Sequence, residues 1–157
     1  MKSPYTEFLR YVKSKIETDS EYVNTITNKG SLNLDDNKGT IYPIFDVFVD
    51  SIVMAETNVI LINATIACVN QRDTNKQETN TDNFFGNDNE VDNLNETLME
   101  VHRVWGQMAD GFNDLGITAS KSPTAEPILE EGKNLHDGWG MSITVEVPIG
   151  VTLCDGC

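Results

Sequence analysis

The segment TIYPIFDVFVDSIVMAETNVILINATIACVNQ, from Thr40 to Gln71, concentrates the β-branched residues of this 157-residue chain. Apolar side chains recur on both sides of a polar break at 55–58, with the period of two that a pleated strand imposes. We therefore predict two long strands joined as an antiparallel hairpin. One face of the second strand is wholly apolar, and its members are Ile60, Ile62, Ala64, Ile66 and Cys68.

The first strand of this hairpin has an apolar face and a mixed face. The apolar face is predicted to comprise Ile41, Phe45, Val47, Val49 and Val53. On the mixed face Asp46 and Asp50 stand among large apolar side chains, which are Tyr42, Ile44, Phe48, Ile52 and Met54. Such a surface favours a sheet that a partner or a neighbouring subunit covers.

Two amphipathic helices are predicted outside the hairpin. The first, near 4–17, begins at Ser3-Pro4, and its outer face carries Glu7, Arg10, Lys13 and Lys15. That face suits either solvent or an acidic neighbouring copy. The second, near 89–111, has the apolar stripe Val91, Leu94, Leu98, Val101, Trp105, Met108 and Phe112. We expect Leu98 and Trp105 to be buried against the hairpin.

Two further strands are predicted near the C-terminus. Pro127 confines the segment around Ala125–Leu129 to a sheet edge, and 133–138 is expected to be a loop. Strict alternation then predicts a strand from Trp139 to Val147. The predicted fold is α+β, with two main helices packed on a mainly antiparallel four-stranded sheet. Residues 1–157 form a single domain with long polar loops near 19–40 and 71–88.

The charge balance disfavours broad contact with nucleic acid. Acidic residues outnumber basic ones by 25 to 11, which gives a formal net charge of −14, and such a chain is repelled by a phosphate backbone. The composition is compatible with a conduit that DNA passes through, with an acidic mimic that occupies a basic partner, or simply with solubility.

Motifs for catalysis, export and metal binding are missing from the sequence. No phosphate-binding loop, dinucleotide fingerprint or nucleophile elbow occurs, so we expect no enzyme. Neither a signal peptide nor a membrane-spanning apolar run is found, so we expect a protein made and kept in the cytoplasm, without membrane contact. There its three cysteines should stay reduced. Cys154 and Cys157 alone supply too few ligands for structural zinc, so no metal or cofactor is expected.

Two places are candidate interfaces. Phe84 and Phe85 interrupt an Asn/Asp-rich loop, and they are expected to dock either on this chain's own core or on a partner. That loop lacks the ligand spacing of a calcium site. Near the C-terminus, Val151 and Leu153 supply apolar surface that would fasten the tail to its own domain or to the next subunit.

The order of helix, long hairpin, helix and final strands resembles that of the tail-terminator and neck-ring proteins of tailed bacteriophages. More specifically, GWGMSITVEVP, from Gly138 to Pro148, with the short cysteine-containing tail, resembles neck proteins of phages that infect Bacteroidetes, including crAss-like phages. The resemblance covers the C-terminal part of the chain. It implies an assembly role without catalytic residues, and the Asn/Asp-rich loop leaves open which ring the protein would form.

From the resemblance we expect a virion structural protein, made in the host cytoplasm, that forms a ring at the head-tail junction or tail terminus. Its partners would be copies of itself and the neighbouring portal, neck or tail proteins, without tight binding of nucleic acid. The alternative is an acidic monomeric inhibitor or DNA mimic that binds a basic host protein.

Overall fold

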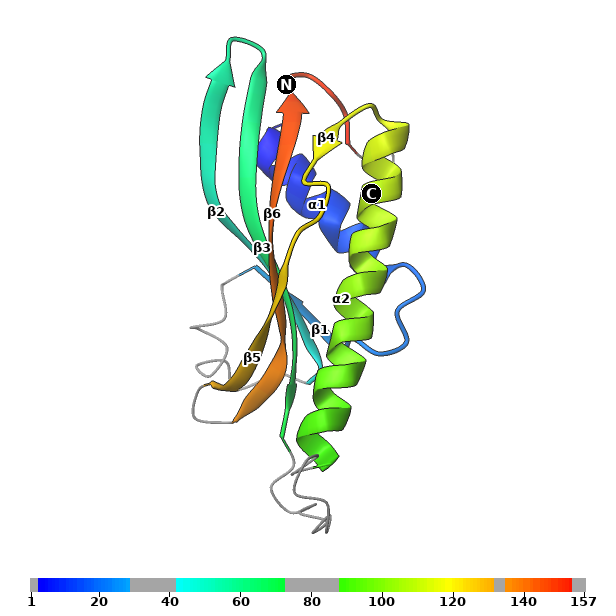
Figure 1. Cartoon of the computed structure of the whole chain (residues 1–157). Coiled ribbons are helices and arrows are strands. Elements are labelled where there is room, and N and C mark those ends of the chain that lie inside the picture. The colour runs from blue at the N-terminus through cyan, green and yellow to red at the C-terminus, as the bar shows by residue number, and fades with distance from the viewer. Residues whose placement is uncertain (1–2, 29–41, 73–87, 132–134, 154–157) are drawn as a thin grey trace.

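The structure, a computed structural model, describes residues 3–28, 42–72, 88–131 and 135–153 (Figure 1). It is an α+β fold, as predicted. The helices are α1 (Pro4–Glu17) and α2 (Asp88–Asp114). The strands are β1 (Thr25–Thr27), β2 (Ile44–Glu56), β3 (Val59–Gln71), β4 (Thr118–Ala119), β5 (Ala125–Glu131) and β6 (His136–Pro148). The described residues thus form a six-stranded sheet where four strands were predicted, because β1 and β4 are too short to produce a periodic pattern.

The sheet has the order β1-β2-β3-β6, and both β4 and β5 pair with the outer side of β6. All pairings are antiparallel except that of β1 with β2, which is parallel. The predicted central hairpin is confirmed, with Thr57 and Asn58 as its turn. The short strand β1 lies in the segment 19–40 that was predicted to be a loop, and β6 begins at His136, inside another predicted loop.

Both helices pack on one face of the sheet, which we call the helix side; the opposite face is the open side (Figure 1). α2 covers β3 and β6, and α1 lies against β2 and α2. The apolar face predicted for β3 is confirmed, because its five members are all buried on the helix side. The alternation predicted for β6 is also confirmed, since Met141, Ile143, Val145 and Val147 are buried and the residues between them are exposed.

β2 contains a β-bulge at Asp50, where its register against β3 shifts by one residue. A bulge reverses the face that the following side chains occupy. Ile52 and Met54 therefore lie on the helix side, and Val53 lies on the open side. The prediction that Val53 shares a face with Val47 is wrong for this reason.

The apolar stripe predicted for α2 is confirmed in the C-terminal half, where Val101, Met108 and Phe112 are buried, and is wrong in the N-terminal half. Leu98 is 36% exposed, so its predicted burial is wrong, whereas Trp105 is half-buried against the core. In the N-terminal half of the helix the buried positions are polar ones, such as Asn93 and Thr97. Thr97 donates a hydrogen bond to the carbonyl of Asn93 at 2.6 Å, and such internal hydrogen bonds remove most of the cost of burying a polar group.

The C-terminus of α2 is fixed by Gly116, one of two glycines near the predicted end. Gly116 has a φ of +66°, a left-handed conformation that suits glycine. The amide of Ile117 donates to the carbonyl of Phe112 at 2.8 Å, and the amide of Gly116 donates to that of Asn113 at 3.1 Å. These two bonds form a Schellman motif, which satisfies the last carbonyls of the helix.

The two helices meet where Gly111 leaves space for Tyr11. A Cβ at Gly111 would lie 2.1 Å from the Tyr11 hydroxyl oxygen. That hydroxyl donates to the carbonyl of Met108 at 3.0 Å, and burial raises the pKa of Tyr11 to about 12. The contact sets how closely α1 approaches α2.

Substitutions on α2 test which of its faces packs on the sheet. Met108→Ala removes a fully buried side chain and should lower the free energy of unfolding by about 2 to 5 kcal/mol. Leu98→Ala, at an exposed position of the same helix, should change it by no more than about 0.5 kcal/mol. Urea denaturation followed by circular dichroism measures both, and equal losses would contradict this orientation of α2.

Two glycines provide a matched test of the β3–β6 contact. A Cβ at Gly138 would lie 2.0 Å from the carbonyl oxygen of Cys68, whereas at Gly106, inside α2, it would meet nothing within 4 Å. Gly138→Ala should therefore destabilise the fold by about 1 to 3 kcal/mol. Gly106→Ala should stabilise it by about 0.5 to 1 kcal/mol, because glycine is a poor helix former. Thermal melts of the two variants should shift in opposite directions.

Candidate functional site

The outer edge of β2 is open along most of the strand. β1 pairs with its first residues only, up to Thr27 opposite Asp46. From Val47 to Glu56 none of the described strands pairs with this edge. A long open edge presents a row of backbone donors and acceptors that another strand can use. It is therefore a candidate surface for association.

Apolar side chains accompany this open edge. Phe48, Ile52, Val53 and Met54 are all exposed, and Met54 reaches 77%. They lie on the part of β2 that follows the short stretch paired with β1. Isolated apolar residues are normal on a surface, but several on one strand typically mark an interaction site. We call this part of the hairpin, residues 48–64, the arm.

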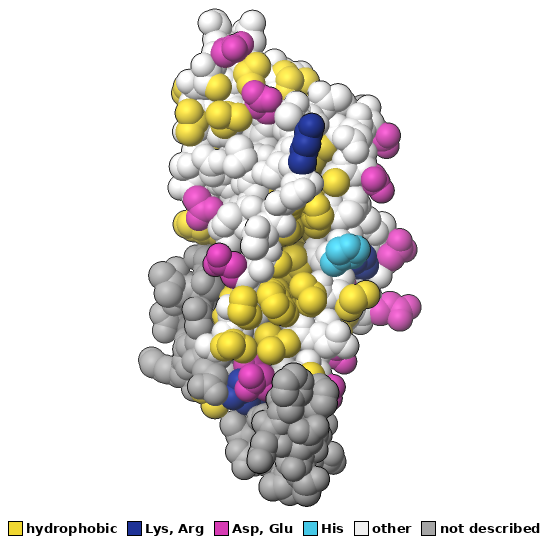
Figure 2. Space-filling model, viewed as in Figure 1, with side chains coloured by type: hydrophobic (Ala, Val, Ile, Leu, Met, Phe, Trp, Pro, Cys, Tyr) yellow, Lys and Arg dark blue, Asp and Glu magenta, His cyan; other side chains and the backbone are white. Residues whose placement is uncertain are grey.

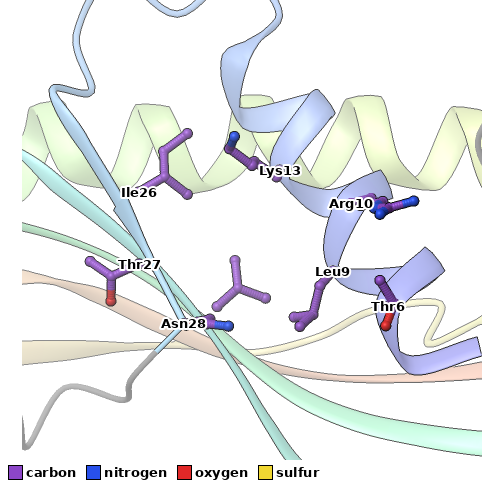
Figure 3. Close-up of a pocket in the computed structure, with 8 residues that line it drawn as sticks. Thr6, Leu9, Arg10, Lys13, Ile26, Thr27 and Asn28 are labelled. Atoms are coloured by element: carbon purple, nitrogen blue, oxygen red, sulfur yellow. The ribbon is translucent and has the colours of Figure 1, made fainter. Parts of the chain in front are cut away.

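A groove of about 210 Å³ lies beside the open edge, between α1 and the strands β1 and β2 (Figure 3). Leu9, Ile26 and Val47 form its apolar lining, and Arg10 and Lys13 of α1 also line it. Figure 3 shows Leu9 on α1 facing the side of the groove that β1 forms. The groove thus combines an apolar lining with positive charge.

Two of the described arginines are held by this chain's own groups. Arg103 donates to Glu100 at 3.0 Å and to the carbonyl of Ile16 at the end of α1 at 3.0 Å. Arg72 contacts Asp137 at 2.6 Å and Glu90 at 2.6 Å. Both guanidinium groups are therefore engaged in contacts within this chain.

The other lysines and arginines of the described ranges lie on α1, apart from Lys121. They are Arg10, Lys13 and Lys15. Lys13 pairs with Glu17 at 3.2 Å, but both side chains are well exposed, so solvent weakens that pair. Two of these cations, Arg10 and Lys13, line the groove beside the open edge of β2.

The opposite margin of the sheet is also open. β5 pairs with β6 on one side only, among the strands that the structure describes, and Leu129 is 46% exposed. Figure 2 shows apolar side chains gathered in the region where β5 and β6 lie beside α2. The exposed residues Leu98 of α2 and Pro127 of β5 belong to these elements. Neither helix covers β5.

A buried polar cluster joins β3, β6 and α2 at one end of the sheet. Asp137 is fully buried and accepts two hydrogen bonds from Arg72, from Nε at 2.9 Å and from Nη2 at 2.6 Å. Asn93 donates to the same carboxylate at 3.5 Å, and the neighbouring His136 ring is hydrogen-bonded to the Tyr42 hydroxyl. These groups satisfy one another, which is typical of a structural network.

Sequence periodicity does not predict this cluster, because it assigns Asp137 to a loop. A signal in the sequence is that an arginine directly follows β3 and that an aspartate lies two residues before Trp139, where the alternating part of β6 begins. In an antiparallel pair these positions meet, and here Gln71 pairs with His136.

The predicted interface residues have different outcomes. Leu153 is buried in this chain's own core and Val151 packs against that core, so this part of the tail is fastened to its own domain. The described residues do not include Phe84, Phe85, Cys154 and Cys157.

Two other groups considered for chemistry are Cys68 and His102. Cys68 is a buried free thiol, and burial raises its pKa, which makes it unreactive. His102 is exposed on α2.

No protein-family model matches the sequence, and no curated protein matches it either. Within the described ranges no helix is long and apolar enough to cross a membrane. The same ranges contain no group of three or more histidine, cysteine, aspartate or glutamate residues that could hold a metal ion. The open edges, the arm and the groove are the surface features of the described residues that suit binding to another protein.

The buried cluster predicts a large difference between two ion pairs. Arg72→Met leaves the Asp137 carboxylate buried without its main partner, so it should lower the free energy of unfolding by about 3 to 5 kcal/mol. Lys13→Met breaks an exposed pair and should cost less than about 1 kcal/mol. Chemical denaturation measures both values, and a small loss for Arg72→Met would contradict a structural role of the cluster.

Proposed function

We propose that this protein is a structural subunit that binds copies of itself through the open edges of its sheet. The arm carries the proposal: a backbone edge that no described strand pairs with and a set of exposed apolar side chains occur on one strand. Leaving such a strand in water favours uncontrolled aggregation, and proteins normally cover it. A defined partner that adds to this edge supplies that cover.

We further propose that the assembly is a ring at the head-tail junction or tail terminus of a phage virion. This part rests on the resemblance of GWGMSITVEVP and the order of the elements to phage neck and tail-terminator proteins. Neighbouring portal, neck or tail proteins are then its further partners. The net charge of −14 supports DNA passage, because an acidic ring repels the phosphate backbone and does not bind it tightly.

The proposed role requires binding and no chemical step. Arg72 and Asp137 are engaged with each other, and the groove beside α1 is lined by leucine, isoleucine and valine with two cations. That arrangement suits a protein segment better than a reacting substrate.

Sedimentation velocity over a range of protein concentrations tests self-association, and negative-stain electron microscopy shows its form. We expect species larger than a dimer, with closed rings in the images, and we expect the protein in purified virions. A protein that stays monomeric at all concentrations and binds one basic host protein would contradict the proposal and favour the acidic inhibitor.

A further inference from the structure

We infer that an apolar strip between α2 and β5 is the docking site for an amphipathic helix of another protein, and that the polar face of this helix is basic. The strip consists of Val91, Leu98 and Trp105 on α2 and of Pro127 and Leu129 on β5. Figure 2 shows apolar side chains gathered in this region. The inference does not depend on the proposed self-association, because a helix on the face of β5 leaves the outer backbone edge of that strand open.

β5 presents its part of the strip on the helix side of the sheet. Pro127 pairs with Trp139 and Leu129 pairs with Asp137, and the side chains of directly paired residues point to the same face. Trp139 lies on the helix side, where its indole Nε1 donates to the carbonyl of Leu94 on α2 at 2.8 Å. Leu129 is 46% exposed, and Pro127 is exposed as well. Neither α1 nor α2 covers them.

α2 turns its part of the strip toward the same margin of the sheet. Val91, Leu98 and Trp105 recur every seven residues, so they lie on one face of the helix. Leu94, whose carbonyl accepts the bond from β6, lies on this face too, which places the face beside β6 and β5. Val91 is 38% exposed and Leu98 is 36% exposed. His102 is the polar residue between Leu98 and Trp105 on this face.

The space beside α2 and over β5 has the dimensions of a helix. α2 lies over β3 and β6. Strands are about 4.8 Å apart and packed helices about 8 to 10 Å apart, so the next helix of the layer would lie about two strands further on, over β5. From Val91 to Trp105 the strip is about 21 Å long, which suits a helix of about four turns. A cavity of about 220 Å³ at its β4 end, lined by Trp105, Phe112 and Ile117 among others, would receive a large side chain of that helix.

Charge favours a basic partner. Asp92 directly follows Val91, and Asp110 lies about five turns further along the same face of α2; both are exposed on the solvent side of the strip. Lysine or arginine side chains on the polar face of a docked helix would lie near them. The net charge of −14 also attracts such a helix from a distance. Lys121 lines the cavity at the β4 end, where the negative C-terminal end of the docked helix would suit it.

Neither described helix of a second copy fits this site. The apolar residues of α1, such as Phe8, Val12 and Ile16, are buried in the core of their own subunit. α2 of a second copy would bring its own Asp92 and Asp110 toward the first pair, and like charges repel one another. The docked helix is therefore assigned to a different protein.

Binding of model peptides tests this inference. The probe is a peptide of leucine and lysine, about 20 residues long, with its leucines at helical spacing. One control has the same composition but alternates the two residues, as an amphipathic strand does, and a second control carries glutamate in place of lysine. Both tryptophans of the chain, Trp105 and Trp139, lie at the strip, so their fluorescence reports its occupation.

We expect the helical basic peptide to bind at least about tenfold more tightly than either control peptide. Equal binding of the alternating peptide would show that the site does not select a helix, and equal binding of the acidic peptide would show that it does not select basic charge. Either result, or no binding of the helical basic peptide, would overturn the inference.

Apolar variants locate the binding surface. Leu98→Gln together with Leu129→Gln should weaken binding of the helical basic peptide by at least about tenfold. Val53→Gln together with Met54→Gln removes exposed apolar side chains from β2 instead and should leave binding unchanged. Circular dichroism confirms that both variants fold. Equal losses in the two variants would place the peptide elsewhere and overturn the inference.

Charge variants with the same change in net charge test the acidic flank. Asp92→Asn together with Asp110→Asn should weaken binding more than Glu56→Gln together with Glu146→Gln, which are exposed on β2 and β6. Added salt should reduce this difference. Equal effects of the two pairs would mean that net charge alone attracts the peptide, and the assigned site would be wrong.

Sedimentation velocity separates this inference from the proposed function. If Leu98→Gln together with Leu129→Gln abolishes self-association, the strip is a contact between copies of this chain and the inference is wrong. If the peptides and variants behave as expected while the unmodified protein stays monomeric, the helix-binding site stands and the proposed function fails.

Discussion

The unbroken antiparallel register between β3 and β6, from Val59 opposite Pro148 to Gln71 opposite His136, determines the arrangement of the rest of the molecule. It aligns the apolar faces of both strands on the helix side, where α2 covers them. It also brings Arg72 and Asp137 close enough to form their ion pair. Because β3 is paired along both sides, the open edges of the sheet are displaced outward to β2 and β5.

Much of the fold could be predicted because β3, β6 and α1 follow simple periods. The errors fall where a local pattern is overridden by its surroundings. The face of β2 reverses at Asp50, since a bulge adds one residue without any change in composition. α2 buries Asn93 and Thr97 instead of Leu98, because hydrogen bonds to the sheet and within the helix make polar burial acceptable there.

Less of the candidate site could be predicted from the sequence. Its exposed apolar residues, such as Phe48 and Met54, are of the same types as core residues. Only the order of the strands shows that no described strand pairs with β2 beside them. An edge is a property of the whole sheet, so no window of sequence contains it. The mixed face predicted for the first strand led to the expectation that a partner covers it, and this stays a prediction; the face was wrong for Ile52 and Met54, which follow the bulge.

The connection between β3 and β6 has a kinetic consequence. β2 and β3 are joined by a tight turn, and a hairpin of this kind forms in about 1 to 10 microseconds, whereas β6 follows β3 only after α2, β4 and β5. Pairings between distant segments form slowly. During synthesis one backbone edge of the apolar strand β3 therefore stays unpaired until β6 has been translated, and other unfinished chains can pair with that edge. The length of that wait, more than the stability of the finished sheet, should govern how much of the newly made protein folds correctly.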